Sequence, residues 1–287
     1  MKADLHTHTT ASDGRVEPQR LVEMVHERGL KAFSITDHDT LDGYWKAVDR
    51  ARELEMELIP GIENTVIWEG KEVHLLAYYF DPGHPAIVRF VAGQKRARRD
   101  RMKRIVSVLQ SQGVDITMDE VMAEAFGGNV GRPHAAAVLI QKRIVGSVAE
   151  AFVRFLDQDK LNVQTEYASL EATVDVFKAA GGVVSLAHPG RMYSVGEVAR
   201  LTECEVDALE CIHPSHPFLV MKRLVALAER AGKLITGGSD FHGKNGDGYD
   251  PFLGIVTLSG QHLSKIRALS DQRKQQYAGS PDVSTSP

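Results

Sequence analysis

Short apolar runs alternate with amphipathic stretches along much of the chain. Seven runs have the length and composition of buried strands: Lys2–Leu5, Ala32–Thr36, Glu57–Gly61, Val73–Phe80, Gly182–Ala187, Ala208–Ile212 and Leu234–Gly238. Helical periodicity follows several of them, over about Pro18–Arg28, Tyr44–Met56, Leu170–Ala180 and Phe218–Ala231. Repeated strand–helix units of this kind predict an α/β fold with a largely parallel sheet.

The middle of the chain has a different pattern. From about Pro85 to Leu161 the sequence shows helical periodicity and no convincing strand. Capping-box patterns at Thr117–Glu120 and Ser147–Glu150 indicate helix starts there. We therefore expect a helical insertion over residues 83–161, which divides a barrel domain into residues 1–82 and 162–278. The Ser- and Pro-rich end, residues 279–287, is expected to be disordered.

Composition and charge narrow the function classes only slightly. With 287 residues and a formal net charge of −4, the chain suits one large domain with an insertion and shows no strong bias toward nucleic acid or membrane. The apolar runs are too short to span a bilayer and the start lacks a signal-like apolar segment, so we expect a cytoplasmic protein. Cys204 and Cys211 are expected to be isolated thiols, and no obligate protein partner is evident.

The chain has twelve histidines, and several of them follow predicted strands together with carboxylates. The strand ends carry these ligand-type residues: His6, His8 and Asp13; Asp37, His38 and Asp39; Glu63; His74; His188; Glu210, His213 and His216; Asp240 and His242. In a barrel or a parallel sheet the carboxyl ends of the strands meet on one face. The sequence therefore predicts that residues distant in the chain converge there on a metal cluster.

The ligand types indicate which metals would bind. His6 and His8 are two residues apart, as are Asp240 and His242, so in an extended chain each pair points to one side. Mixed imidazole and carboxylate ligands suit Zn²⁺, Mn²⁺ or Fe²⁺, and the scarcity of cysteine argues against a structural zinc site or an iron–sulfur cluster.

An isolated histidine is more often a surface or core residue, and His26, His84 and His262 are expected to be no more than that.

The motifs DLHTHT with SDG, TDHDT, GIE, AHPGR and GSDFH, in that order, closely resemble the PHP family, named for polymerase and histidinol phosphatase. The resemblance covers about residues 1–82 and 165–245. The insertion with Gly131-Arg132-Pro133-His134 resembles the branch that includes nucleoside 3′,5′-bisphosphate phosphatases and a 5′→3′ exonuclease acting on short RNA. A departure is GIENT, where relatives often have an aliphatic residue and then Ser after GIE.

The resemblance implies a distorted (β/α)7 barrel with two or three divalent metal ions at its C-terminal face. The ions would be Mn²⁺, Zn²⁺ or Fe²⁺, with Mg²⁺ as an alternative. Carried over position by position, the first would be held by His6, His8, Glu63 and Asp240; the second by Glu63, His74 and His188; and the third by Asp13, His38 and His242.

Three divalent ions against three ligand carboxylates leave a net charge of about +3, which favours an anionic substrate such as a phosphate monoester. A metal-bridging hydroxide would attack in line, without a protein nucleophile. Arg191 is expected to stabilise the transition state and His216 to protonate the leaving group. Arg132 and His134 are expected to hold a second phosphate or the end of a nucleotide; the alternative is that Arg132 and Pro133 merely begin a helix.

The leading hypothesis is thus a metal-dependent phosphoesterase acting on nucleoside 3′,5′-bisphosphates or the 5′ ends of short RNA. Alternatives are a histidinol-phosphate-type or sugar phosphatase, an amide hydrolase, and a non-catalytic PHP domain that binds nucleotides or regulates a partner. The basic run Lys95–Arg104 lacks aromatic residues for base stacking, so a solvated helix face explains it better than a nucleic-acid patch.

Overall fold

The computed structural model describes residues 2–245, 248–249 and 251–278. Its main sheet has eight strands in the order β10-β1-β2-β3-β4-β5-β6-β7. The strands are β1 Lys2–Asp4, β2 Ala32–Ile35, β3 Glu57–Trp68, β4 Lys71–Tyr78, β5 Val183–Leu186, β6 Ala208–Ile212, β7 Leu234–Gly237 and β10 Leu258–Ser259. A two-stranded ribbon, β8 Lys244–Asn245 and β9 Gly248–Tyr249, stands apart from it.

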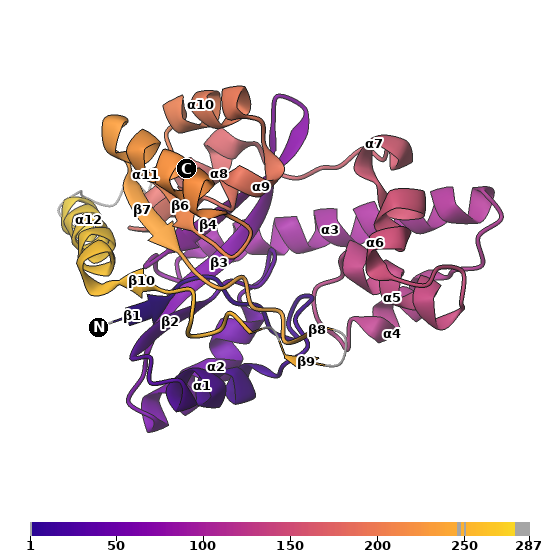
Figure 1. The fold of residues 1–287 in the computed structure, drawn as a ribbon, viewed down its shortest axis with the longest axis horizontal. Helices are drawn as coiled ribbons and strands as arrows, with labels where there is room; N and C mark the ends of the chain where they lie inside the picture. Colours follow the sequence, from indigo (N-terminus) through magenta and orange to yellow (C-terminus); the bar gives the residue numbers. More distant parts are fainter. Residues whose placement is uncertain (1, 246–247, 250, 279–287) are drawn as a thin grey trace, which may run out of the picture.

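The sheet curls until β1 and β7 meet (Figure 1). Leu5 N donates to Gly237 O at 3.3 Å, and His8 N donates to Phe241 O at 2.7 Å. Thr7 and Phe241 form a parallel bridge just beyond the two strands. These contacts nearly close a seven-stranded barrel, with β10 added antiparallel to β1, and the predicted α/β barrel is confirmed.

The strand directions differ from the prediction in one place. β3 and β4 form an antiparallel hairpin, in which Thr65 lies opposite His74, and β4 is also antiparallel to β5. β3 is therefore longer than the predicted Glu57–Gly61, because the residues after Gly61 pair with β4. The N-terminal half of β4 lies at the rim where the parallel strands end, and this reversal brings His74 to the predicted cluster.

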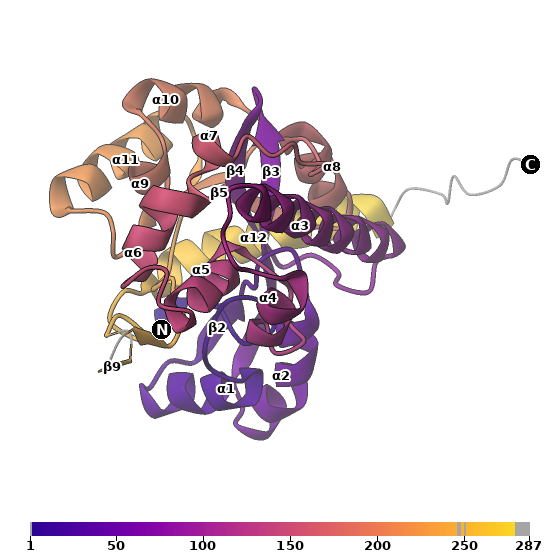
Figure 2. The same ribbon diagram turned by 90° about the vertical axis from the view of Figure 1, so that its right-hand side faces the viewer.

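Helices surround the barrel (Figures 1 and 2). The four predicted here are confirmed, with ends shifted by up to three residues: α1 Pro18–Glu27, α2 Asp42–Glu53, α8 Leu170–Ala179 and α11 Phe218–Arg230. α9 Pro189–Met192, α10 Val195–Glu203 and α12 Gly260–Ala278 were not predicted. Within the described residues, no helix has both the length and the apolar composition needed to cross a membrane.

The middle segment is helical, as predicted, with α3 Pro85–Ser111, α4 Met118–Glu124, α5 Arg132–Gln141, α6 Val148–Ala151, a π-helical turn Phe152–Leu156 and α7 Gln158–Leu161. The complete capping box at Thr117 and Glu120 begins α4. The helices α4–α7 lie together on one side of the barrel (Figure 1). The predicted disordered tail, residues 279–287, falls outside the described part of the chain.

Two hydrophobic cores meet along α3. Ile87 and Val91, near its start, pack in the barrel core, whereas Met102, Ile105 and Leu109, near its end, pack among α4–α7. The helix is thus shared, and it fixes the helical segment against the barrel mouth. The domain limits 1–82, 83–161 and 162–278 stay a prediction.

Candidate metal centre

The nine predicted metal-ligand residues converge at one mouth of the barrel. They come from the loop after β1 (His6, His8, Asp13), the loop after β2 (His38), β3 (Glu63), β4 (His74), the turn after β5 (His188) and the loop after β7 (Asp240, His242). Every one of them has an imidazole nitrogen or carboxylate oxygen within 4 Å of another member. The loops therefore gather residues from the whole barrel into one cluster.

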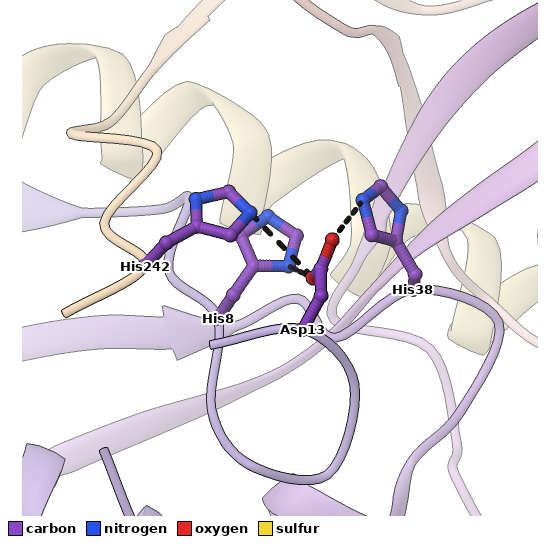
Figure 3. Close-up of side chains that lie close together, drawn as sticks. All are labelled: His8, Asp13, His38 and His242. Carbon is purple, nitrogen blue, oxygen red and sulfur yellow. Dashed lines mark ion pairs between the residues drawn. The ribbon is translucent and has the colours of Figure 1, made fainter. Parts of the chain in front are cut away.

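Asp13 is surrounded by imidazoles (Figure 3). Its Oδ1 lies 3.6 Å from His242 Nε2 and 3.8 Å from His8 Nδ1, and its Oδ2 lies 3.7 Å from His38 Nε2. The ligand atoms of these four residues all lie within 4.8 Å of one another. This grouping contains the predicted third set and adds His8 to it.

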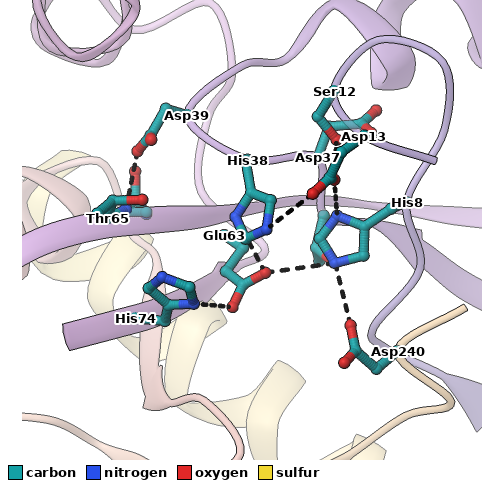
Figure 4. A network of polar contacts seen from close by, with 12 residues as sticks. His8, Ser12, Asp13, Asp37, His38, Asp39, Glu63, Thr65, His74 and Asp240 are labelled. Atoms are coloured by element: carbon teal, nitrogen blue, oxygen red, sulfur yellow. Dashed lines mark hydrogen bonds and ion pairs between the residues drawn. The ribbon is translucent and has the colours of Figure 1, made fainter. Parts of the chain in front are cut away.

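Glu63 lies between two groups of histidines (Figure 4). Its Oε2 is 3.2 Å from His6 Nε2 and 3.3 Å from both His8 Nε2 and His38 Nδ1. Its Oε1 is 3.0 Å from His74 Nδ1 and 2.9 Å from His188 Nε2. One carboxylate thus faces two ligand groups with its two oxygens, as a bridging ligand would.

Asp240 completes the cluster and involves a histidine outside the predicted ligand set. Its Oδ1 lies 3.3 Å from the Nε2 atoms of His6 and His8. Its Oδ2 lies 3.2 Å from His213 Nε2. His6, His213 and Asp240 form a further group that could hold a metal ion.

Several features of the cluster fit divalent cations. The Nε2 atoms of His6 and His8 lie 3.1 Å apart. The Nδ1 atoms of His8, His38 and His188 are buried without a hydrogen-bond partner among the described residues. Buried polar atoms are normally paired. Imidazoles that crowd around three buried carboxylates suit metal coordination better than they suit a hydrogen-bonded core.

The charges of the ligand side chains point the same way. Burial raises the pKa of Glu63, but His38, His6 and His74 outweigh it and hold that pKa well below its usual value. The pKa of Asp240 is lowered in the same way, despite burial, by His6 and His242. For His8, hydrogen bonds to Asp240 and Glu63 outweigh burial and raise the pKa to about 10. The ionised carboxylates thus retain a proton on His8, and metal binding would replace this proton with a cation.

A second layer of polar residues orients the ligands. Glu210 is fully buried; its Oε1 lies 2.8 Å from His6 Nδ1, and its Oε2 accepts from the backbone N of His188 at 2.7 Å. His188 and Asp240 have positive φ angles, 29° and 51°. Such backbone geometry is strained in residues other than glycine, and it persists where surrounding contacts hold it. The sequence drew attention to Glu210 but did not reveal this role.

The helical segment also fixes two of the ligand loops. Buried Asn129 donates from Nδ2 to His38 O at 2.8 Å, and its backbone N donates to Ala11 O at 2.7 Å. Arg98 pairs through Nη1 with Asp39 Oδ2 at 2.7 Å. These contacts hold the loops that carry Asp13 and His38.

A cavity of about 1140 Å³ lies between the cluster and the helical segment. The barrel contributes ligand residues to its wall, including Glu63, and α3 and α5 contribute Arg98, Arg101 and Arg132. The interpretation of Lys95–Arg104 as a solvated face is therefore wrong for Arg98 and Arg101, whose side chains are only 11% and 9% exposed. The sequence did contain a signal of this shared position: Arg98 and Arg101 are three residues apart, which places them on one face of the helix.

Two of the predicted substrate-contacting residues line this cavity. Arg191 is largely exposed, with Nη1 3.9 Å from Asp240 Oδ2. Arg132 begins α5 and also lines the cavity, so both sequence interpretations of its position hold geometrically.

The other two, His134 and His216, are engaged elsewhere. His134 Nδ1 accepts from Gly131 N at 2.9 Å and caps α5. His216 Nδ1 lies 3.0 Å from Cys211 O, and its Nε2 accepts from Gly190 N at 3.1 Å. Both ring nitrogens of His216 are thus held by backbone groups, which does not favour it as the proton donor. The geometry favours His213, which lines the cavity.

A nearly closed α/β barrel with this histidine–carboxylate cluster, beside a cavity lined by arginines, fits a metal-dependent phosphoesterase. The family model described as the PHP domain matches residues 4–201. The chain therefore belongs to the PHP domain family, as the sequence motifs indicated.

Relatives and solved structures agree with this assignment. The chain is 34% identical over 252 residues to the 5′-3′ exoribonuclease Rnm of Escherichia coli, covering 83% of this chain and 84% of the relative. It is 28% identical over 255 residues to the 3′,5′-nucleoside bisphosphate phosphatase of Chromobacterium violaceum, covering 86% and 89%. A Bifidobacterium adolescentis structure assigned as a metal-dependent phosphoesterase superposes with a TM-score of 0.80 at 31% identity, covering 93% of this chain and 96% of the other.

Proposed function

We propose that this protein hydrolyses phosphate esters of nucleotides, either nucleoside 3′,5′-bisphosphates or the 5′ ends of short RNA. The observation that carries the proposal is Glu63, which faces two groups of histidines across the floor of an arginine-lined cavity. The names of two relatives, a 5′-3′ exoribonuclease and a 3′,5′-nucleoside bisphosphate phosphatase, support these substrates.

Two or three divalent ions would be held by the predicted sets: His6, His8, Glu63 and Asp240; Glu63, His74 and His188; and Asp13, His38 and His242. The distances add His8 to the third set. Bound divalent ions would lower the pKa of coordinated water and withdraw charge from phosphoryl oxygens. We prefer Mn²⁺, Zn²⁺ or Fe²⁺ because most of the ligands are imidazoles.

Protein side chains would supply binding and proton transfer. Arg191 lies at the cavity side of Asp240 and would bind phosphoryl oxygens through charge-assisted hydrogen bonds. His213 is the better candidate for the leaving-group proton, because Nδ1 is positioned 2.7 Å from Ser215 Oγ and Nε2 faces the cluster at Asp240. Nε2 would deliver the proton to the departing oxygen.

A substrate comparison tests this proposal. Protein of known metal content would be assayed with adenosine 3′,5′-bisphosphate, a 5′-phosphorylated oligoribonucleotide, histidinol phosphate and a sugar phosphate. We expect the first or second to have the highest kcat/KM, and His6→Ala to abolish it. A clear preference for histidinol phosphate or the sugar phosphate would contradict the substrate class. Nucleotide binding without turnover by the metal-loaded protein would instead support a regulatory domain.

A further inference from the structure

His74 lies where the pairing between β4 and β5 ends. The last residues of the two strands in register are Leu75 and Leu186, and one step further Ala187 N donates to His74 O at 3.0 Å. At the next residue, His188, the chain turns away from β4 with a φ of 29°. The backbone N–H of His74 therefore needs an acceptor from outside the sheet.

Tyr193 supplies this acceptor. Its hydroxyl oxygen accepts from His74 N at 3.1 Å. Tyr193 follows α9 and directly precedes Ser194, which caps α10, and its ring packs against the barrel core. The side chain thus reaches from the segment after β5 back to β4. This one segment holds both backbone groups of His74, the oxygen through Ala187 and the nitrogen through Tyr193.

The contact joins the two chain segments that carry the imidazoles of one predicted ligand set. His74 Nδ1 lies 3.0 Å from Glu63 Oε1 (Figure 4), and His188 Nε2 lies 2.9 Å from the same oxygen. The two imidazole centroids are 5.3 Å apart. Metal–ligand distances vary by only about 0.2 Å, so an ion held by these residues depends closely on the spacing of the two histidines.

A second contact attaches the same two segments but touches no ligand residue. Lys71, at the start of β4, pairs through Nζ with Glu197 Oε1 of α10 at 2.5 Å. The Lys71 side chain is 67% exposed, and such exposed pairs contribute little. This pair therefore allows attachment of the segments to be distinguished from positioning of His74.

We propose that Tyr193 is a positioning residue for the second metal ion, and that its hydrogen bond to the backbone of His74 fixes the spacing of His74 and His188 around that ion. The proposal rests on the second ligand set of the proposed function and does not depend on which phosphate ester is hydrolysed. Tyr193 acts through His74, since its hydroxyl contacts the backbone nitrogen while the imidazole faces Glu63.

The test is a titration of chelator-treated protein with Mn²⁺, followed by calorimetry and by elemental analysis of the bound metal. Tyr193→Phe keeps the ring and removes the acceptor. His74→Ala is the reference variant that identifies the binding step of the second ion. Loss of a group that orients a ligand typically reduces metal affinity by about 10- to 100-fold. We expect Tyr193→Phe to weaken by about tenfold the step that His74→Ala removes, and to leave the other steps unchanged.

Electron paramagnetic resonance gives a readout that a purely structural role would not change. Glu63 faces two ligand groups with its two oxygens, so Mn²⁺ ions held by both groups should be magnetically coupled. At the same Mn²⁺ concentration, Tyr193→Phe should show less of the coupled signal than wild type. Lys71→Met is the matched control and should equal wild type in both measurements.

The three variants separate the possible failures. Equal weakening of every binding step in Tyr193→Phe would overturn the positioning role and indicate a general loss of stability. A step that is lost in His74→Ala and intact in Tyr193→Phe would also overturn it, while leaving the metal sites of the proposed function in place. Wild-type metal binding by His74→Ala would contradict the second ligand set itself, and the role of Tyr193 with it.

Discussion

The carboxylate of Glu210 accepts a hydrogen bond from His6 Nδ1 at 2.8 Å, although the two residues are 204 positions apart in the chain. Both side chains are completely buried. His6 lowers the pKa of Glu210, which stays ionised in spite of its burial, so the imidazole is the donor. This leaves His6 Nε2 as the nitrogen that faces Glu63 and Asp240. Glu210 thus fixes which nitrogen of His6 is available to a metal ion.

Glu210→Gln should weaken metal binding without unfolding the protein. The amide keeps the shape of the side chain, but its NH₂ group replaces one of the two oxygens that accept from His6 Nδ1 and His188 N, so one of these donors loses its acceptor. Loss of such a partner typically reduces metal affinity by about 10- to 100-fold. Metal titration by calorimetry measures this. Glu203→Gln, on the exposed end of α10, is the control, and equal affinities of the two variants would refute the role of Glu210.

His6→Ala and Asp240→Ala should each abolish turnover, because each removes a side chain that faces several other members of the cluster. Steady-state assays with saturating Mn²⁺ or Zn²⁺ would measure this. His84→Ala is the matched histidine control: its Nδ1 accepts from Ala86 N at 3.2 Å and caps α3. It should lose about 1 kcal/mol of stability and keep its turnover. Turnover by either cluster variant at more than background would show that the residue is dispensable.

Removing metal by chelation should abolish activity and lower the Tm. Three carboxylates, Asp13, Glu63 and Asp240, would then be compensated mainly by imidazole protons. Differential scanning calorimetry before and after dialysis against chelator measures the change. Both activity and Tm should recover when Mn²⁺ or Zn²⁺ is restored. A Tm that is independent of metal would argue against a shared cation site.

Asn129→Ala should loosen the loops that carry Asp13 and His38. The substitution leaves the carbonyl of His38 without its buried donor, which costs about 1–3 kcal/mol. We expect a lower Tm and a lower metal content per molecule, measured by elemental analysis after gel filtration. Unchanged metal content with a lowered Tm would mean that Asn129 contributes to stability alone.

The sequence by itself determined the barrel and most of the metal cluster. Strand–helix alternation predicted the α/β fold. The two-residue spacing of His6 and His8, and of Asp240 and His242, predicted that the side chains of each pair point to the same side of the chain. Both predictions depend only on local periodicity. Local rules also located the capping box of α4. The convergence of eight of the nine ligand-type residues, all except His74, followed from one general property of barrels, that the carboxyl ends of the parallel strands share a face.

Tertiary structure decided what no local rule can reach. The reversal of β4 depends on pairing with β3 and β5, and it explains why His74 lies at the rim although it is near the start of its strand. The choice of His213 over His216 depends on which ring nitrogens the folded backbone occupies. Such properties arise from contacts between distant segments, and periodicity along the chain does not contain them.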